Sequence, residues 1–151
     1  MRPRRAVRLG RPGTFAGMES TVVTVHTGGR PAVVDLTDEV AGFVRSRGDG
    51  LVSVFVPHAT AGVAIIETGA GSDDDLVRAL EDVLPRDGRW RHRHGSAGHG
   101  ADHVLPAFIA PSVTVPVLDG RMALGTWQSV VLVDTNVDNP DREVRLSFLP
   151  G

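Results

Sequence analysis

Apolar and polar positions along the chain follow two periods, one typical of strands and one typical of helices. The alternating, β-branched stretch 20–26 predicts a strand, and two further β-rich runs, 51–57 and 61–67, stand on either side of a short polar break. The stretch REVRLSFL (142–149) alternates strictly and predicts a last strand. Strands at both ends with helices between them predict an α+β fold with a mostly antiparallel sheet.

Two segments carry the spacing of amphipathic helices. Thr37 stands where its side chain can cap the first helix. Apolar residues then follow at spacings of three and four, at Val40, Phe43 and Val44. The second segment, 72–85, begins with a serine and three aspartates, whose charges favour the positive end of a helix, and it stops at a proline. We expect each helix to bury one face.

The remaining stretches predict a long loop, a short helix and a hairpin. Residues 86–103 are rich in arginine, glycine and histidine, and a loop of this length inside a compact domain is more often functional or disordered than decorative. The segment 103–110 predicts a helix that Pro106 limits to about one turn. In 112–135 the pair Asp119-Gly120 predicts the turn of a hairpin.

Composition narrows the chemistry that the chain can carry. The 151 residues are 41% hydrophobic and 23% charged, which is typical of one soluble globular domain. There is no cysteine, and all 16 basic residues are arginine. Disulfides, thiolate metal sites and Schiff-base lysines are therefore excluded. A metal would have to be bound by histidine and carboxylate, and a phosphate by arginine or backbone amides.

Charge and apolar runs bear on location and partners. No run reaches 18 apolar residues, so we expect no membrane span. The basic segment 1–13 lacks the apolar core of a secretory signal; we expect a loosely ordered start and a cytoplasmic protein. A net charge of −2 argues against nucleic acid as a partner, although five arginines in the first eleven residues leave an arginine arm as a weaker alternative.

The stretch WRHRHGSAGHGADH holds four of the six histidines. On an extended segment His92 and His94 share a face, whereas Gly100 argues against a helical pair of His99 and His103. Imidazole is the commonest protein ligand for zinc and similar ions. Spacing alone leaves two alternatives open, a metal-binding loop and a solvated basic loop.

Several polar residues outside this loop are further candidates. His58 interrupts two expected core strands, either as a hydrogen-bonded interior histidine or as a third ligand. Glu67 ends an apolar run, where it can be a ligand, a general base or a turn residue. Trp127 and Gln128 are costly to bury without partners, so they either pack at a strand start or contact a ligand. Arg142 suits a phosphate or carboxylate, although a surface ion pair is commoner.

Four motifs follow one another along the chain: VPHATAGVAIIE, the histidine loop with ADHVLPA, SVTVPVLDGRMALGTWQSV, and REVRLSFL. In this order they resemble the YjbQ-like proteins, often labelled secondary thiamine-phosphate synthase enzymes. The resemblance covers nearly the whole chain, and its most specific part is 112–130. It implies one compact α+β domain over residues 1–151 that assembles as a homotrimer.

The resemblance also implies a polar site with a divalent metal at three histidines, and such a donor set favours zinc. Glu67 and Asp75 match acidic residues of the family, whereas Ala59 and Ile66 replace polar ones. The histidines His94 and His99 are additional to the family pattern. The candidate residues are the metal ligands His58, His92 and His103, the catalytic residues Glu67, Asp75 and Gln128, and the substrate contacts Thr60, Trp127 and Arg142.

The activity implied by the resemblance is a weak coupling of hydroxymethylpyrimidine diphosphate with a thiazole phosphate, with loss of pyrophosphate. Mg²⁺ usually serves pyrophosphate chemistry and prefers oxygen ligands, so a histidine site suggests hydrolysis or small-anion binding as well. We therefore expect a metal-binding enzyme that acts on small phosphorylated or anionic substrates. The alternative is a non-enzymatic trimeric module that binds a metabolite or anion without turnover.

Overall fold

The computed structural model describes residues 13–15 and 17–151. The predicted loose N-terminal segment lies outside these residues, except for Gly13. The elements in chain order are β1 (Gly13–Phe15), β2 (Met18–His26), β3 (Ala32–Asp35), α1 (Thr37–Val44), β4 (Gly50–Phe55), β5 (Ala61–Ile66), α2 (Ser72–Val83), α3 (His99–Asp102), a 3₁₀ turn η1 (Leu105–Ala107), β6 (Ser112–Leu118), β7 (Arg121–Met122), β8 (Ser129–Asp134) and β9 (Asp141–Pro150).

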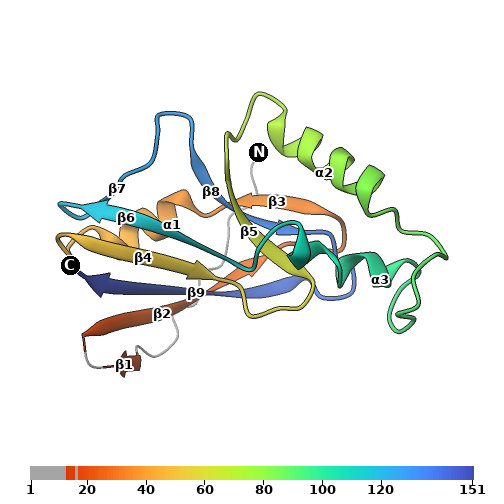
Figure 1. The fold of residues 1–151 in the computed structure, drawn as a ribbon, viewed down its shortest axis with the longest axis horizontal. Helices are drawn as coiled ribbons and strands as arrows, with labels where there is room; N and C mark the ends of the chain where they lie inside the picture. Colours follow the sequence, from red (N-terminus) through yellow and green to blue (C-terminus); the bar gives the residue numbers. More distant parts are fainter. Residues whose placement is uncertain (1–12, 16) are drawn as a thin grey trace.

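The strands form two antiparallel sheets. One has the order β1-β2-β9-β4-β6-β7 and the other has the order β3-β8-β5 (Figure 1). All pairings between the described strands are antiparallel. The expected α+β fold with a mostly antiparallel sheet is therefore confirmed. Among the described residues, no helix has the length and apolar character that crossing a membrane requires.

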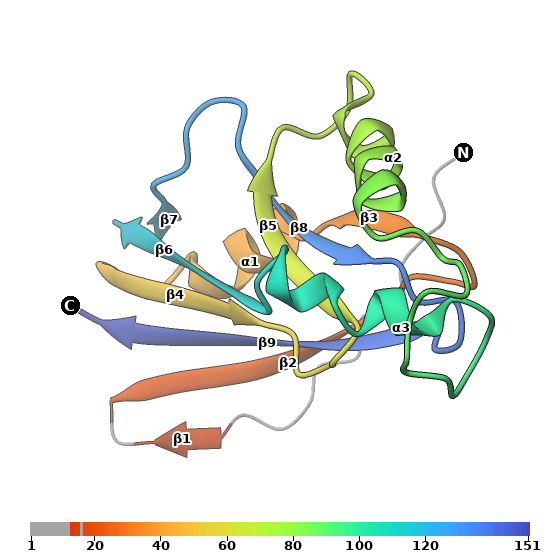
Figure 2. The ribbon, with the colours of Figure 1, turned by 45° about the vertical axis from the view of Figure 1, so that its right-hand side comes forward.

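The small sheet is the middle of three layers, since β8 is buried on both faces. Val130 and Leu132 join the core that faces the six-stranded sheet and α1. Val131 and Val133 join a second core with Leu80 of α2, on the side where α2 and α3 lie (Figure 2). A strand that packs on both sides needs an unbroken apolar run, which explains the sequence SVVLVD.

Thr37 does not cap α1 as predicted, because it is the first residue of the helix. Its backbone N–H donates instead to the Asp35 carboxylate at 2.8 Å. The Thr37 hydroxyl accepts the N–H of Val130 at 3.0 Å. A residue before Thr37 thus supplies the acceptor for the helix start, and the threonine ties α1 to β8.

The predicted hairpin forms, but it is shorter than expected. Asp119 and Gly120 both have positive φ, 49° and 69°, and they join β6 to β7. The chain then leaves the six-stranded sheet after Met122, and β8 pairs between β3 and β5 in the other sheet. The apolar run of β8, which was expected to pair with β6, forms the centre of the middle layer instead.

Two glycines give a matched test of this packing. A Cβ on Gly62 of β5 would lie 2.2 Å from the Ile109 carbonyl oxygen, whereas one on Gly42 of α1 would meet nothing within 4 Å. We expect Gly62→Ala to lower the free energy of unfolding by about 1–3 kcal/mol. Gly42→Ala should raise it by about 0.5–1 kcal/mol, since alanine favours a helix interior. Urea unfolding measures both, and an unchanged midpoint for Gly62→Ala contradicts the packing.

Candidate metal centre in the histidine loop

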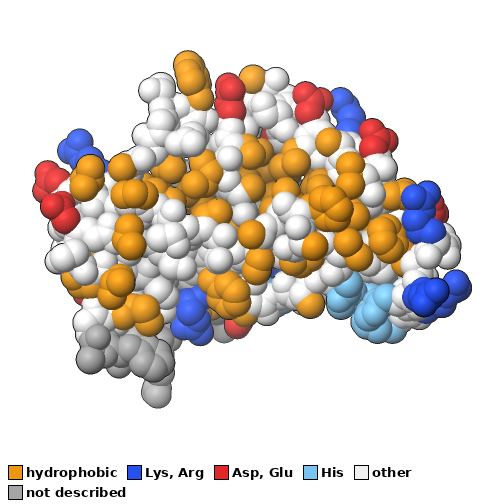
Figure 3. All heavy atoms as spheres, in the orientation of Figure 1, with side chains coloured by type: hydrophobic (Ala, Val, Ile, Leu, Met, Phe, Trp, Pro, Cys, Tyr) orange, Lys and Arg blue, Asp and Glu red, His pale blue; other side chains and the backbone are white. Residues whose placement is uncertain are grey.

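The histidine loop, defined as residues 86–103, packs at one end of the molecule. Figure 3 shows histidine side chains gathered there, with arginines beside them. Trp90 anchors the loop by packing into the second core, and its Nε1 donates to the Pro85 carbonyl at 2.7 Å. A Cβ on Gly100 would lie only 2.4 Å from the Trp90 Cβ, so this close approach requires a glycine.

The expectation that Gly100 prevents a helical pair of His99 and His103 was wrong. His99 begins the single turn α3, and His103 follows its last residue. The two Nε2 atoms lie 3.0 Å apart. Gly100 is explained by its contact with Trp90 rather than by a break in the helix, and one helical turn brings the two rings together.

All four loop histidines converge on one point. The group comprises His92, His94, His99 and His103, and one ligand atom from each lies within 4.8 Å of the others. The centre of the His92 ring lies 4.1 Å from the ring centres of both His94 and His103. Nitrogens bound to a tetrahedral zinc at about 2.0–2.1 Å lie roughly 3.3 Å apart, so the four rings would have to move closer together around an ion.

Two of these rings favour the neutral form that a metal ligand needs. Desolvation lowers the pKa of His103 below its ordinary value of 6.5, and the rings of His92, His99 and His94 lower it further, against the charge of Asp102. The pKa of His92 is lowered first by desolvation and then by His94 and His99. A neutral imidazole keeps a lone pair on one ring nitrogen, which is the atom that binds a metal.

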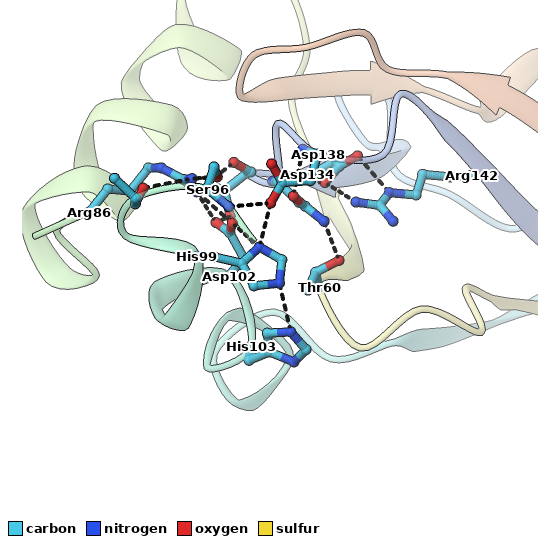
Figure 4. A network of polar contacts seen from close by, with 12 residues as sticks. Thr60, Arg86, Ser96, His99, Asp102, His103, Asp134, Asp138 and Arg142 are labelled. Carbon is cyan, nitrogen blue, oxygen red and sulfur yellow. Dashed lines mark hydrogen bonds and ion pairs between the residues drawn. The ribbon is translucent and has the colours of Figure 1, made fainter. Parts of the chain in front are cut away.

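A buried carboxylate fastens the loop to the connection between β8 and β9. Asp102 is fully buried, and Arg86 donates to both of its oxygens. The Thr135 hydroxyl donates to Oδ1 of Asp102 at 2.9 Å, and Arg86 also donates to the Thr135 carbonyl at 3.2 Å (Figure 4). These contacts join the start of the loop, its end and the neighbouring connection.

Asp138 of the same connection reaches the loop from the other side. Its Oδ2 accepts the backbone N–H of Ser96 at 3.0 Å and lies 2.9 Å from Nδ1 of His99. The bond from Ser96 lowers the pKa of Asp138, so the carboxylate stays ionised near neutral pH.

A cavity of about 500 Å³ opens beside the cluster. Its lining includes Trp90, His92 and His99, together with the guanidinium-bearing residues Arg86 and Arg93. Arg86 is held by Asp102, whereas Arg93 is exposed. The cavity therefore combines imidazoles with positive charge, which suits a small anion.

His58 lies outside this group of histidines. Its Nε2 accepts the backbone N–H of Glu143 at 3.0 Å, and its Nδ1 lies 3.5 Å from Nη1 of Arg142. Arg142 is buried and donates to Asp134 at 2.7 and 2.9 Å (Figure 4). The hydroxyl of Thr60, which is also buried, accepts from Asn136 at 3.1 Å.

The other predicted site residues lie on the surface and do not line the cavity. Glu67 is exposed after the end of β5, and Asp75 is exposed on α2 with Arg78 at 3.3 Å. Trp127 is 73% exposed, and Oε1 of Gln128 accepts the N–H of Gly125 at 2.8 Å. Of the site residues predicted from sequence, the structure thus places His92 and His103 in the cluster, together with His94 and His99.

Comparison with known proteins agrees with the fold. A family model described as UPF0047 protein YjbQ-like matches residues 21–151. The chain belongs to the YjbQ-like UPF0047 family. UPF0047 protein Rv2556c of Mycobacterium tuberculosis is 66% identical over 134 residues, covering 89% of this chain and 100% of the relative. UPF0047 protein YugU of Bacillus subtilis is 34% identical over 113 residues, covering 70% of this chain and 81% of the relative.

Solved structures of other proteins share this architecture. The hypothetical protein APE1520 from Aeropyrum pernix superposes with a TM-score of 0.79 at 32% identity, covering 88% of this chain and 99% of the other. A YbjQ-like protein of unknown function from Sulfolobus solfataricus gives a TM-score of 0.82 at 24% identity, covering 89% and 98%, which is a likeness of fold alone.

The carboxylates around the cluster were missed in the sequence. The spacing of His99, Asp102 and His103 carried a signal, because residues three and four apart share a helix face. No sequence signal pointed to Asp138, because it lies 35 residues beyond His103 and only the fold brings the two segments together.

The environment of His58 predicts a pH effect on stability. Desolvation, followed by the Arg142 guanidinium, lowers the pKa of His58 below 6.5 in the folded state. The neutral ring therefore contributes stability above about pH 6.5, and this is lost as the pH falls through the lower folded-state pKa. We expect the wild type to lose more unfolding free energy than His58→Gln between about pH 7.5 and 5.5.

Urea unfolding at both pH values measures this difference. His26→Gln is the matched control, because His26 is an exposed histidine paired with exposed Asp141. Equal losses for the wild type and His58→Gln would show that His58 does not bind its proton more weakly in the folded state.

Proposed function

We propose that this protein binds a zinc-like divalent ion through the histidine loop and acts on a small phosphorylated or anionic metabolite. The observation that carries the proposal is the convergence of four imidazole ligand atoms within 4.8 Å. Unlike the set expected from the resemblance, the proposed ligands are His92, His94, His99 and His103, without His58.

The donor set fits this class of metal. Histidine nitrogens suit zinc and similar ions, whereas Mg²⁺ and Ca²⁺ prefer oxygen ligands. The lowered pKa values of His92 and His103 favour the neutral, ligand-competent rings. A zinc ion would supply a Lewis acid that polarises a phosphoryl or carboxyl oxygen.

The cavity beside the cluster supports an anionic substrate. We propose that Arg93 contacts a phosphate or carboxylate group, because it lines the cavity and its side chain is exposed. Arg142 is less suited to this role, since two of its nitrogens are bound to buried Asp134. The coupling of two phosphorylated thiamine precursors is the activity that the family resemblance implies for such a cavity.

A second candidate function, a non-enzymatic binding module, is favoured if all four histidines bind the ion at once, whereas the enzyme requires one of the four to stay unbound. Structural zinc sites are filled by four protein ligands, whereas catalytic sites keep one position open. Four histidines bound at once would leave no position for substrate. An enzyme is supported if the zinc-loaded protein couples hydroxymethylpyrimidine diphosphate to thiazole phosphate and releases the pyrophosphate of the diphosphate. Stabilisation by either compound without product supports a binding module.

We also propose self-association, with a homotrimer as the state that the resemblance implies. Leu51 and Leu149 are paired on the outer face of the six-stranded sheet, and Leu118 lies on the same face. They are 44%, 52% and 60% exposed, and Figure 3 shows hydrophobic side chains across this side of the molecule. Such an exposed apolar face marks an interaction surface.

Sedimentation equilibrium at micromolar concentration tests this self-association. The measured mass should correspond to three chains, and the mass of a monomer would contradict the proposal.

The metal assignment makes a direct prediction. Untagged protein incubated with zinc and then desalted should hold about one ion per chain, as expected for one tetrahedral site. His92→Ala and His103→Ala should lose most of this zinc, because each removes a ligand. His58→Ala should retain it, since His58 lies outside the group. Plasma mass spectrometry gives the zinc content, and circular dichroism shows that each variant is folded.

Two results would contradict the assignment. No zinc in the wild type returns the loop to a basic, anion-binding segment. Zinc lost in His58→Ala but kept in folded His92→Ala places the ion elsewhere.

A further inference from the structure

His99 differs from the other three histidines of the cluster in its surroundings. Its side chain is 7% exposed, and Nε2 points to the centre of the cluster, 3.0 Å from Nε2 of His103. On the opposite side of the ring, Nδ1 is buried and makes no hydrogen bond of normal geometry to any described residue. A buried ring nitrogen without such a partner requires an explanation.

Two carboxylates face this nitrogen. Oδ2 of Asp138 lies 2.9 Å from Nδ1, off the direction of the ring N–H, and Oδ2 of Asp102 lies 3.5 Å away. Asp102 is already occupied by Arg86 and Thr135. Asp138 is the nearer of the two, and it also accepts the Ser96 N–H. A small rotation of the ring would aim Nδ1–H at Asp138.

The surroundings of Asp138 hold it in this place. Its own backbone N–H donates to Oδ1 of Asn136 at 2.8 Å. Gly95 makes room for the contact, because a Cβ there would lie 2.7 Å from Oδ2 of Asp138 and 3.0 Å from Cγ of His99. Gly95 also has a φ of 76°, which side chains rarely adopt. Figure 4 shows Asp138 and His99 side by side, although they come from different segments.

The tautomer of His99 connects this contact to metal binding. A neutral imidazole carries its proton on one nitrogen and a lone pair on the other. Since Nε2 faces the cluster, His99 can bind a metal only with its proton on Nδ1. A carboxylate at Nδ1 stabilises that tautomer and fixes the direction of the ring, as outer carboxylates do for metal-bound histidines.

We propose that Asp138 is the positioning residue of the metal centre: it holds the proton of His99 on Nδ1 and directs Nε2 into the histidine cluster. The proposal rests on the proposed zinc site. It also assigns His99, which the sequence pattern treated as additional, as the most firmly oriented ligand of the four.

The first test needs no metal. Long-range ¹H–¹⁵N correlation spectra of the metal-free protein at about pH 8, where imidazoles are neutral, report the tautomer of each ring. We expect the Nδ1–H tautomer for His99 in the wild type and a shift toward Nε2–H in Asp138→Ala. An Nε2–H tautomer in the wild type would overturn the proposal whether or not zinc binds.

The second test measures zinc affinity with a competing chromophoric chelator. We expect Asp138→Ala to weaken zinc binding by about 10–100-fold, as the loss of an outer-shell partner does. Asp141→Ala is the matched control and should leave affinity unchanged, because Asp141 also lies 2.9 Å from a histidine Nδ1, but that of His26, outside the cluster.

A double-mutant cycle separates ring positioning from loop anchoring. If Asp138 acts through His99, Asp138→Ala should cause no further loss of affinity in a His99→Ala background. If it only anchors the loop through Ser96, the loss will be the same in both backgrounds, and the proposal is overturned. Absence of zinc binding by the wild type would contradict the proposed function, and the tautomer measurement would still decide the role of Asp138.

Discussion

The histidine cluster depends on one buried ion pair, between Asp102 and Arg86. Asp102 has no exposed surface, so its charge must be balanced inside the protein. Arg86, at the start of the loop, supplies the opposite charge to Asp102 at its end, and the Thr135 hydroxyl donates a further hydrogen bond from the β8–β9 connection. Removing one partner of a buried pair typically costs about 3–5 kcal/mol, so this pair holds the two ends of the 18-residue loop together.

A second buried ion pair, between Asp134 and Arg142, lies at the end of β8, next to Thr135, which contacts the first pair. Asp134, the last residue of β8, accepts two bonds from Arg142 and one from Thr27 at 2.7 Å. Oδ1 of Asp134 also accepts the N–H of Asn136, and the Asn136 side chain in turn accepts the N–H of Asp138. Because β8 is packed on both faces, the Asp134 carboxylate stands at the end of the most deeply buried strand. A rigid support of this kind suits a site whose ligands come from a loop.

The sequence predicted much of this fold, because its strongest signals are local. Periodicity placed β2, β4, β5, β9 and α2 close to their observed bounds. The assignment of β8 to a separate sheet was missed, because a run that is apolar on both faces does not say which neighbours it pairs with. The cap of α1 was misassigned for a related reason: Thr37 bonds to Val130, a residue far away in the sequence.

The site was predicted in part, and the limits have the same origin. Four histidines in one stretch left a metal loop and a solvated basic loop as alternatives, and the structure places His92 and His103 in a cluster of ligand atoms. The place of His58 beside Arg142, and of Asp138 beside His99, depends on how distant segments pack.

The most direct measurement is X-ray absorption at the zinc edge of the loaded protein. We expect imidazole nitrogens at about 2.0–2.1 Å, with the multiple scattering of histidine rings. A shell made only of oxygen atoms would contradict it.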